Sequence, residues 1–364
     1  MAQHVISLRR PRIGFIIGKD CEDLVKKKTL KKLSYVPDDY RCDGENIDVD
    51  VAIPFWISRH YDVDVDIIDT VDGDLSEKRL KSNDLNFCIG FDVITGDWFK
   101  HYDATLPTLA RKIFKRSKQN KIYPPWKLQD FVYKKGAYLK KFEKAEIPIA
   151  PTMLIRSTGK FDLARSKRIL NRIKKQGWGD FISKPEMGAG SVGFQKFDAE
   201  KVTPAEFLKY LKKYYKDFPG FILQQAMKGF YKFWEIRIWW YNGKFAYAIA
   251  NKAKVVTGTK EKISKRPPKA IIDQCRKIGK RIFPLLPKLK GKDGKDHPPV
   301  MIRTDFGCCQ GNSMDKTKYF LNEFELQAAN YFARHTPFPV VEKGSKAFVK
   351  TFEEMTGEKL RKLC

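Results

Sequence analysis

The chain has 364 residues, enough for about two domains, and 42% of them are hydrophobic, so it can bury a sizeable core. No stretch approaches the roughly 18 consecutive apolar residues of a membrane span, and the seven cysteines are irregularly spaced without a Cys-x-x-Cys pair. These features argue against a membrane protein, a zinc site and a disulfide framework, and they predict a cytoplasmic protein. The net charge of +28 indicates an anionic partner: nucleic acid, membrane surface, nucleotide, phosphorylated metabolite or acidic peptide.

The charge is unevenly distributed along the chain. Residues 37–103 contain 17 Asp and Glu against 6 Lys and Arg, a net of −11, which leaves +39 for the rest. The aspartates between Asp62 and Asp74 invite comparison with a calcium-binding loop. Ile67, however, stands where an EF-hand loop starting at Asp62 needs glycine. The alternation of acidic and apolar residues from Asp62 to Ile67 instead predicts a strand with its carboxylates in water.

The first third of the chain predicts an N-terminal α/β domain. Its two short apolar runs, residues 12–18 and 86–91, are typical of buried strands, and Lys- and Asp-rich segments separate them. The paired prolines Pro124 and Pro125 then mark a junction, because they bar a helix. The spacing of apolar residues predicts one amphipathic helix over residues 127–145.

A glycine-rich segment follows, in which Gly188, Gly190 and Gly193 match the G-x-G-x-x-G pattern of dinucleotide-binding loops. That pattern requires a helix directly after the glycines, whereas here an alternating strand follows and the next helix begins only at Thr203. The segment therefore predicts two strands joined by a glycine loop. The backbone N–H groups of this loop, with Lys184 in the first strand, can bind phosphate. An ordinary glycine-rich turn is the alternative interpretation.

Residues 234–252 predict a β-hairpin, because Asn242-Gly243 at their centre is the favoured two-residue turn. When this turn sets the register, paired residues have numbers that sum to 485. Each strand then has one mostly apolar face, which is suited to a core.

The other face of this hairpin carries Glu235, Arg237 and Trp239. In the expected register these residues lie opposite three alanines of the second strand, the first of them Ala250, with Lys252 next along. Small residues opposite an acid, a base and a tryptophan leave space above the sheet. We interpret this face as the wall of a ligand cavity, with a solvated face as the alternative.

Two more strands are predicted near the end of the chain. Alternation puts Arg303 and Asp305 on one face of the first strand. It puts Glu323 and Glu325 on one face of the second. If these faces coincide, the converging carboxylates repel each other unless a divalent cation neutralises them, and Mg²⁺ with substrate phosphates is the natural occupant. Surface salt bridges are the alternative.

The order of these motifs resembles that of the ATP-grasp superfamily. The resemblance runs from about Tyr123 to Asn330, somewhat over half of the chain. It implies an ATP-grasp fold, of the α/β (α+β) class, with an N-terminal α/β pre-ATP-grasp domain. The implied divisions are residues 1–118 for the N-terminal domain, 119–335 for the ATP-grasp domain (a glycine-rich lid subdomain at about 148–228 and a metal and nucleotide core at about 229–335), and 336–364 for a helical tail.

The resemblance also implies a role for each motif residue. The implied ATP contacts are Lys135, Lys184, Gly188, Gly190, Ser191, Gln225, Ala226, Met227 and Glu235; the implied catalytic residues are Arg237, Lys252 and Arg303; the implied metal ligands are Asp305, Glu323 and Glu325. The family usually has Glu at the position of Gln225 and more often has Asn at that of Glu325. The implied cofactors are ATP and two Mg²⁺ ions, in place of which Mn²⁺ can serve.

The implied activity is that of an ATP-dependent carboxylate–amine ligase, which phosphorylates a carboxylate and lets an amine attack the acyl phosphate. The substrates would be a small-molecule or peptide carboxylate and an amine acceptor, and the basic composition favours an anionic substrate. Two alternatives remain: an ATP-grasp kinase of a polyanionic small molecule such as an inositol phosphate, and a basic nucleic-acid-binding protein. Nucleic acid is the least favoured partner, because the carboxylate cluster has the wrong charge for it.

Overall fold

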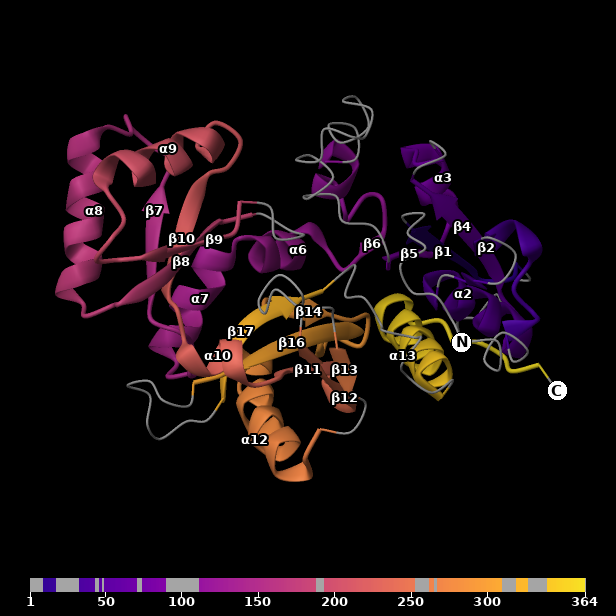
Figure 1. Ribbon diagram of the computed structural model, residues 1–364. Helices are drawn as coiled ribbons and strands as arrows, with labels where there is room; N and C mark the ends of the chain where they lie inside the picture. The colour runs from indigo at the N-terminus through magenta and orange to yellow at the C-terminus, as the bar shows by residue number, and fades with distance from the viewer. Residues whose placement is uncertain are drawn as a thin grey trace.

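The computed structural model of the chain describes residues 9–17, 33–42, 46–47, 49–70, 74–89, 111–187, 193–252, 262–264, 267–309, 319–326 and 339–363 (Figure 1). These residues form three larger sheets, one parallel and two antiparallel, with helices packed against them. This architecture confirms the predicted α/β class. None of the described helices is both long and apolar enough to cross a membrane.

The N-terminal sheet is parallel, with the strand order β4-β1-β5-β6. Its strands are β1 (Arg12–Ile17), β4 (Asp64–Asp69), β5 (Leu85–Cys88) and β6 (Ile122–Tyr123), and its helices are α2 (Val49–His60) and α3 (Glu77–Ser82). Because β6 pairs with β5, the sheet runs past residue 118. The C-terminal helix α13 (Pro339–Thr356) packs against α2 and β5. The helical tail thus completes the N-terminal core, where the rings of Phe348 and Phe87 meet edge to face.

The alternating aspartates of β4 differ from the prediction. Asp64 is exposed as expected, but Asp66 is only 6% exposed. It accepts hydrogen bonds from Arg79 Nη2, at 2.8 Å, and from Asn83 Nδ2, at 2.9 Å. The second half of β4 is buried, so its carboxylate needs a cationic partner, which α3 supplies.

The single helix predicted over residues 127–145 is two helices, α6 (Trp126–Tyr133) and α7 (Lys135–Lys144). They are separated at Lys134, whose ψ of 67° is not helical. Apolar side chains remain buried on both sides of the break, so their spacing in the sequence does not reveal it. The break places Lys135 in the first turn of α7, from which its side chain reaches the third sheet.

The second sheet, here called the lid sheet, is antiparallel in the order β7-β10-β8-β9. Its strands are β7 (Thr152–Arg156), β8 (Asp180–Pro185), β9 (Gln195–Asp198) and β10 (Gly220–Gln225). The helices α8 (Leu163–Lys175) and α9 (Pro204–Tyr214) cover one face and enclose an aromatic core (Figure 1). The pairing of β8 with β9 confirms the predicted strand–loop–strand unit, and Thr203 caps α9 together with Glu206.

The third sheet, here called the core sheet, has the order β13-β12-β11-β16-β17. Its strands are β11 (Glu235–Tyr241), β12 (Lys244–Lys252), β13 (Lys262–Ser264), β16 (Met301–Cys308) and β17 (Tyr319–Glu325). The helix α12 (Lys269–Lys280) packs on one face so tightly that a Cβ on Gly279 would come within 2.5 Å of the Trp240 ring. Asn242 and Gly243 have positive φ, as the predicted turn requires.

The predicted register of the β11–β12 hairpin is correct only beside the turn. Tyr241 pairs with Lys244 and Trp240 with Phe245, but a β-bulge between Trp239 and Trp240 then shifts every later pair by one residue. Trp239 therefore lies opposite Tyr247, beyond which the expected alternation of faces on β12 is reversed.

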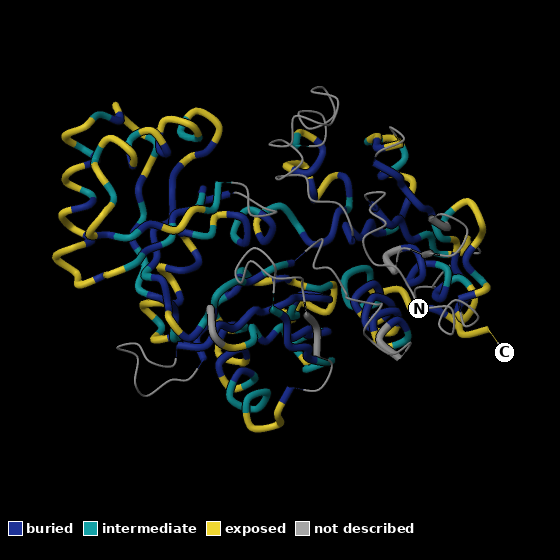
Figure 2. The backbone as a smooth tube through the Cα atoms, viewed as in Figure 1, coloured by how far each residue is buried: buried dark blue, intermediate teal, exposed yellow. Residues whose placement is uncertain are grey.

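Several short elements complete the described structure. They are the 3₁₀ turns Asp38–Tyr40 and Phe283–Leu285, the helix α10 (Lys228–Lys232), and the strands β2 (Arg41–Cys42), β3 (Asn46–Ile47), β14 (Leu289–Lys290) and β15 (Asp296–His297). One of them, α10, lies between the lid sheet and the core sheet. The largest hydrophobic cluster spans the N-terminal sheet, α7 and the core sheet, whereas the lid sheet has a separate one. Figure 2 shows many exposed positions on the outer helices of the lid sheet.

Candidate functional site

Strand pairing gathers the predicted metal ligands on the face of the core sheet opposite α12. Arg237 of β11 lies across from Asp305 of β16, which in turn lies across from Glu323 of β17. In the next row, Arg303 lies across from Glu325. The faces of the two predicted strands therefore coincide, as a metal cluster requires.

The three carboxylates form one cluster. One side-chain oxygen from each of Asp305, Glu323 and Glu325 lies within 4.8 Å of the other two. Arg303 donates two hydrogen bonds of 2.9 Å to Asp305, and its Nη2 lies 2.6 Å from Glu325 Oε2. An all-oxygen donor set suits a hard cation such as Mg²⁺. Because the guanidinium holds two of these carboxylates in place, the residues fit a divalent ion.

Lysines from two different elements neutralise Glu323. The amino group of Lys135 donates a hydrogen bond to Glu323 Oε1. Burial opposes the ionisation of this carboxyl, but Lys135 and Lys184 outweigh it and lower the pKa of Glu323 below its usual range. Burial lowers the pKa of the Lys184 amino group as well. Two cations thus stand beside an ionised carboxylate, where a phosphate group could bind between them and a metal ion.

Glu325 has the opposite electrostatic character. Burial raises the pKa of its carboxyl to about 7; Glu323 and Asp305 act in the same direction, and Arg303 opposes them. Without a metal ion, Glu325 therefore carries a proton for part of the time at neutral pH. Proton loss from this residue completes the ligand set.

Glu235 and Arg237 extend the site toward the N-terminal end of β11. Arg237 Nε donates a hydrogen bond of 3.0 Å to Glu235 Oε2 and lies 3.7 Å from Asp305 Oδ2. Asn322 Nδ2 donates a bond of 3.2 Å to Glu235 Oε1. The sequence prediction missed Asn322, because simple alternation puts it on the opposite face from Glu323. A register shift in the β16–β17 pairing leaves Asn322 unpaired, and its side chain reaches the site.

Asn251 lies on the face that carries Glu235, where the sequence analysis expected a different residue. It pairs with Glu235, and its side chain is fully buried. Neither its amide oxygen nor its amide nitrogen has a hydrogen-bond partner within the described part of the chain. The register expected from the turn puts Ala250 at this position. The bulge exchanges the two residues, so a donor and an acceptor face the site.

The same shift moves the other predicted residues of β12. The residues paired with Glu235, Arg237 and Trp239, which were expected to be alanines, are Asn251, Ile249 and Tyr247, whereas Ala248 and Ala250 belong to the hydrophobic core. By strand alternation, Lys252 lies on the same face as Ala248 and Ala250. Its amino group lies 6.0 Å from the centre of the Trp234 ring. The described structure therefore does not bring Lys252 together with Arg237.

The predicted adenine segment connects the lid sheet to α10. The N–H groups of Gln225 and Ala226 already bond to the carbonyls of Pro151 and Asp180, so contacts from these two residues to a base would use their carbonyl oxygens. Met227 is buried with Phe320. The predicted lid residues Gly188, Gly190 and Ser191 lie outside the described residues.

Comparison with known proteins gives similarity in structure only. No protein-family model and no curated protein matches the sequence. D-cycloserine synthetase DcsG matches 94% of this chain and 99% of its own, with a TM-score of 0.64 and 13% identity. D-alanine–D-alanine ligase from Bacillus anthracis, solved with ATP, matches 95% of this chain and 99% of its own, with a TM-score of 0.55 and 12% identity. ATP-grasp ligase PsnB, solved with a minimal precursor, matches 93% of this chain and 100% of its own, with a TM-score of 0.50 and 11% identity. The fold of these ligases extends over nearly the whole chain.

Proposed function

We propose that the chain, which has the ATP-grasp fold predicted from its motifs, is an ATP-dependent carboxylate–amine ligase. It would use ATP to convert a carboxylate to an acyl phosphate, and an amine would displace the phosphate to give an amide, ADP and phosphate. One observation carries this proposal: the carboxylates of Asp305, Glu323 and Glu325 converge within 4.8 Å, beside lysines from α7 and the lid sheet. That combination suits the phosphates of a metal-bound nucleotide.

The carboxylate cluster would hold one or two Mg²⁺ ions, or Mn²⁺ in their place. A bound ion would neutralise charge on the transferring phosphoryl group. Arg303 is occupied by Asp305 and Glu325, so it would act by keeping both carboxylates in position. Arg237, which is held by Glu235, would stabilise the transferring group or the substrate carboxylate.

The remaining residues would bind ATP. Lys135 and Lys184 would contact its phosphates, together with the loop that contains Gly188, Gly190 and Ser191. Closure of this loop would exclude water, which otherwise hydrolyses an acyl phosphate. Gln225, Ala226 and Met227 would hold the adenine, and Glu235 would lie near the ribose. We propose Asn251 as a further contact, because its buried amide pairs in register with Glu235.

The substrates would be a small-molecule or peptide carboxylate and an amine. The chain outside residues 37–103 carries a charge of +39, which favours an anionic substrate. The residues assigned to ATP account for only a few of these cations. The rest of the charge is available to attract a substrate.

A product screen tests the proposal. The protein, Mg²⁺ and ATP would be incubated with a metabolite extract, and masses that appear only with ATP would be identified, with Asp305→Asn as the blank. A ligase releases equal amounts of ADP and free phosphate along with a condensation product. Release of ADP with a phosphorylated product and no free phosphate would identify a kinase instead and contradict the proposal.

A further inference from the structure

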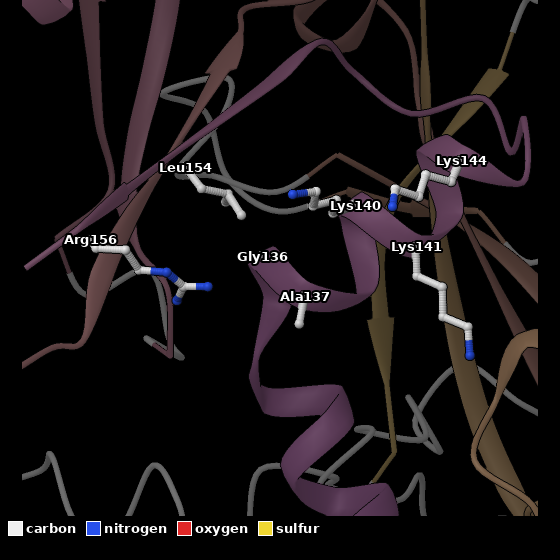
Figure 3. Close-up of a pocket in the computed structure, with 7 residues that line it drawn as sticks. All are labelled: Gly136, Ala137, Lys140, Lys141, Lys144, Leu154 and Arg156. Carbon is white, nitrogen blue, oxygen red and sulfur yellow. The ribbon is translucent and has the colours of Figure 1, made fainter.

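A groove separates α7 from the edge of the lid sheet, away from the carboxylate cluster. Its volume is about 520 Å³, and its walls are the outer side of α7 from Gly136 to Lys144, with Leu154 and Arg156 of β7 opposite. Figure 3 shows the side chains of Lys140 and Arg156 projecting toward each other from the two walls. This volume lies within the range of small-molecule binding sites, so an open groove of this size can hold a small ligand against its walls.

The charge of the groove is predominantly positive. Lys140 and Lys144 are one helical turn apart on α7, both exposed, and no carboxylate lies within ion-pair distance of either among the described residues. Arg156 is bound to Glu186, a buried residue whose Oε2 lies 2.6 Å from the guanidinium. Lys141 points away and donates to the carbonyl of Leu285. Unpaired lysines on one helical face repel each other, and a bound anion would relieve that repulsion.

The groove is separate from the proposed ATP-binding face, although the two are lined by consecutive residues of α7, Lys135 on the ATP side and Gly136 in the groove. The amino group of Lys135 is bound to Glu323 in the carboxylate cluster. Gly136 faces the other way, since a Cβ there would lie 2.6 Å from Glu186 Oε1 and 2.7 Å from Leu154. Residues 136, 140 and 144 follow each other at helical spacing, so they form one stripe along the groove.

We propose that this groove binds a small polyanion, a ligand with at least two carboxylate or phosphate groups, one for each of Lys140 and Lys144, which lie one helical turn apart. A third anionic group would reach Arg156, and Leu154 offers an apolar contact. Because α7 carries Lys135 and β7 belongs to the lid sheet, the ligand contacts two elements that both lead to the site. The proposal does not depend on the ligase activity.

Calorimetric titration of the full chain tests the proposal. The probes are tripolyphosphate and a terminally blocked triglutamate peptide, each titrated with Mg²⁺ and a saturating non-hydrolysable ATP analogue present to occupy the nucleotide site. The test variant is Lys140→Gln with Lys144→Gln. The matched control is Lys209→Gln with Lys213→Gln, two exposed lysines at the same spacing on α9.

At least one probe should bind, and the α7 double variant should weaken it roughly fivefold or more, while the α9 variant leaves it unchanged. Tighter binding of tripolyphosphate identifies phosphate as the natural group, and tighter binding of triglutamate identifies carboxylate. Failure of both probes to bind, or equal weakening by both variants, would overturn the proposal. Failure of the ATP analogue to bind would contradict the proposed function and leave the groove titration readable.

Discussion

The core sheet and the lid sheet are both antiparallel and both bury aromatic rings, but the strands of the core sheet also bury a charged pair. The core sheet buries charge: Arg303 and Asp305 are 4% and 1% exposed on β16, which is paired on both sides. The lid sheet has a core of rings such as Phe181 and Phe207, and the lysines and arginines of its helices α8 and α9 are mostly exposed. Among its strands, β8 contributes Lys184 to the electrostatics of the cluster.

In the proposed ligase, this difference would give the two sheets different roles. Converging carboxylates repel each other, so they must be fixed by neighbouring strands and by cations such as Arg303. A cover that closes on ATP needs only a stable core of its own and a few phosphate contacts. Changes in the core sheet should therefore abolish turnover, whereas changes in the lid sheet should weaken nucleotide binding.

The largest effect is expected for Asp305→Asn. Loss of one carboxylate from the cluster should reduce turnover by about 100-fold or more, because the phosphoryl group loses metal-ion stabilisation. Asparagine has nearly the same shape, and Arg303 retains Glu325, so the fold should survive. ADP release with a metabolite extract measures turnover, and thermal unfolding provides the control. Full activity in this variant would remove the metal cluster from the mechanism.

Lys184→Gln tests the contribution of the lid sheet. Loss of a charged phosphate contact, worth about 1.5–3 kcal/mol, should raise the dissociation constant of Mg·ATP by about 10-fold to 100-fold. Direct titration of the nucleotide measures it. Lys196→Gln is the matched control, since Lys196 lies on β9 of the same sheet and pairs with Asp180. If both variants weaken the binding of Mg·ATP equally, the lid sheet affects nucleotide binding only through its overall charge.

The carboxylate cluster could be predicted from the sequence because it depends on alternation over a few residues. Arg303 and Asp305 are two apart, as are Glu323 and Glu325, and each pair stays on one face of its strand. Strand–loop–strand order likewise distinguished the glycine segment from a dinucleotide-binding loop.

The two β-bulges could not be predicted, and they account for the differences between the expected and the observed neighbours of Glu235. The Asn-Gly turn determines the pairs beside it, but neither Trp239 nor Trp240 signals the shift that follows. One extra residue reverses the faces of everything beyond it, so Asn251 comes to lie on the face that carries Glu235 and Lys252 on the opposite face. Packing of the Trp239 ring on Tyr247, at 4.6 Å between ring centres, accompanies the shifted register.

Ala248→Leu tests that register. Ala248 lies in the hydrophobic core, so the larger side chain should overpack it and destabilise the protein by about 1–3 kcal/mol. Chemical denaturation measures the loss of stability. The KM for ATP of the protein that remains folded should stay unchanged. The unshifted register makes the opposite prediction: a blocked ligand site with normal stability. Lys244→Ala, at an exposed position of the same strand, is the control.

The pKa of Glu325 predicts a pH dependence within the core sheet. Its value of about 7 lies above that of an ordinary carboxyl, so the residue becomes protonated as pH falls through neutrality. A protonated ligand cannot bind the metal, and Mg²⁺ affinity should therefore fall by up to about tenfold per pH unit below 7. Titration of Mg²⁺ between about pH 6 and pH 8 measures this slope. Glu325→Asn, which removes the titrating carboxyl, should flatten it; an unchanged slope would assign the proton to another group.

The smallest effect is expected for Asn251→Ala. This substitution distinguishes an amide that binds a substrate from an amide that only stabilises the fold. If the amide bonds a substrate, Asn251→Ala should raise the KM for that substrate by about threefold to tenfold, the equivalent of one neutral hydrogen bond. Removal of an amide that has no partner in the described chain should leave the midpoint of thermal unfolding unchanged or slightly higher. Ile249→Val, on the same face of β12, is the matched control and should leave KM unchanged. A fall in stability with unchanged KM for both substrates would show that the amide bonds the protein itself, and the site would then end at Glu235.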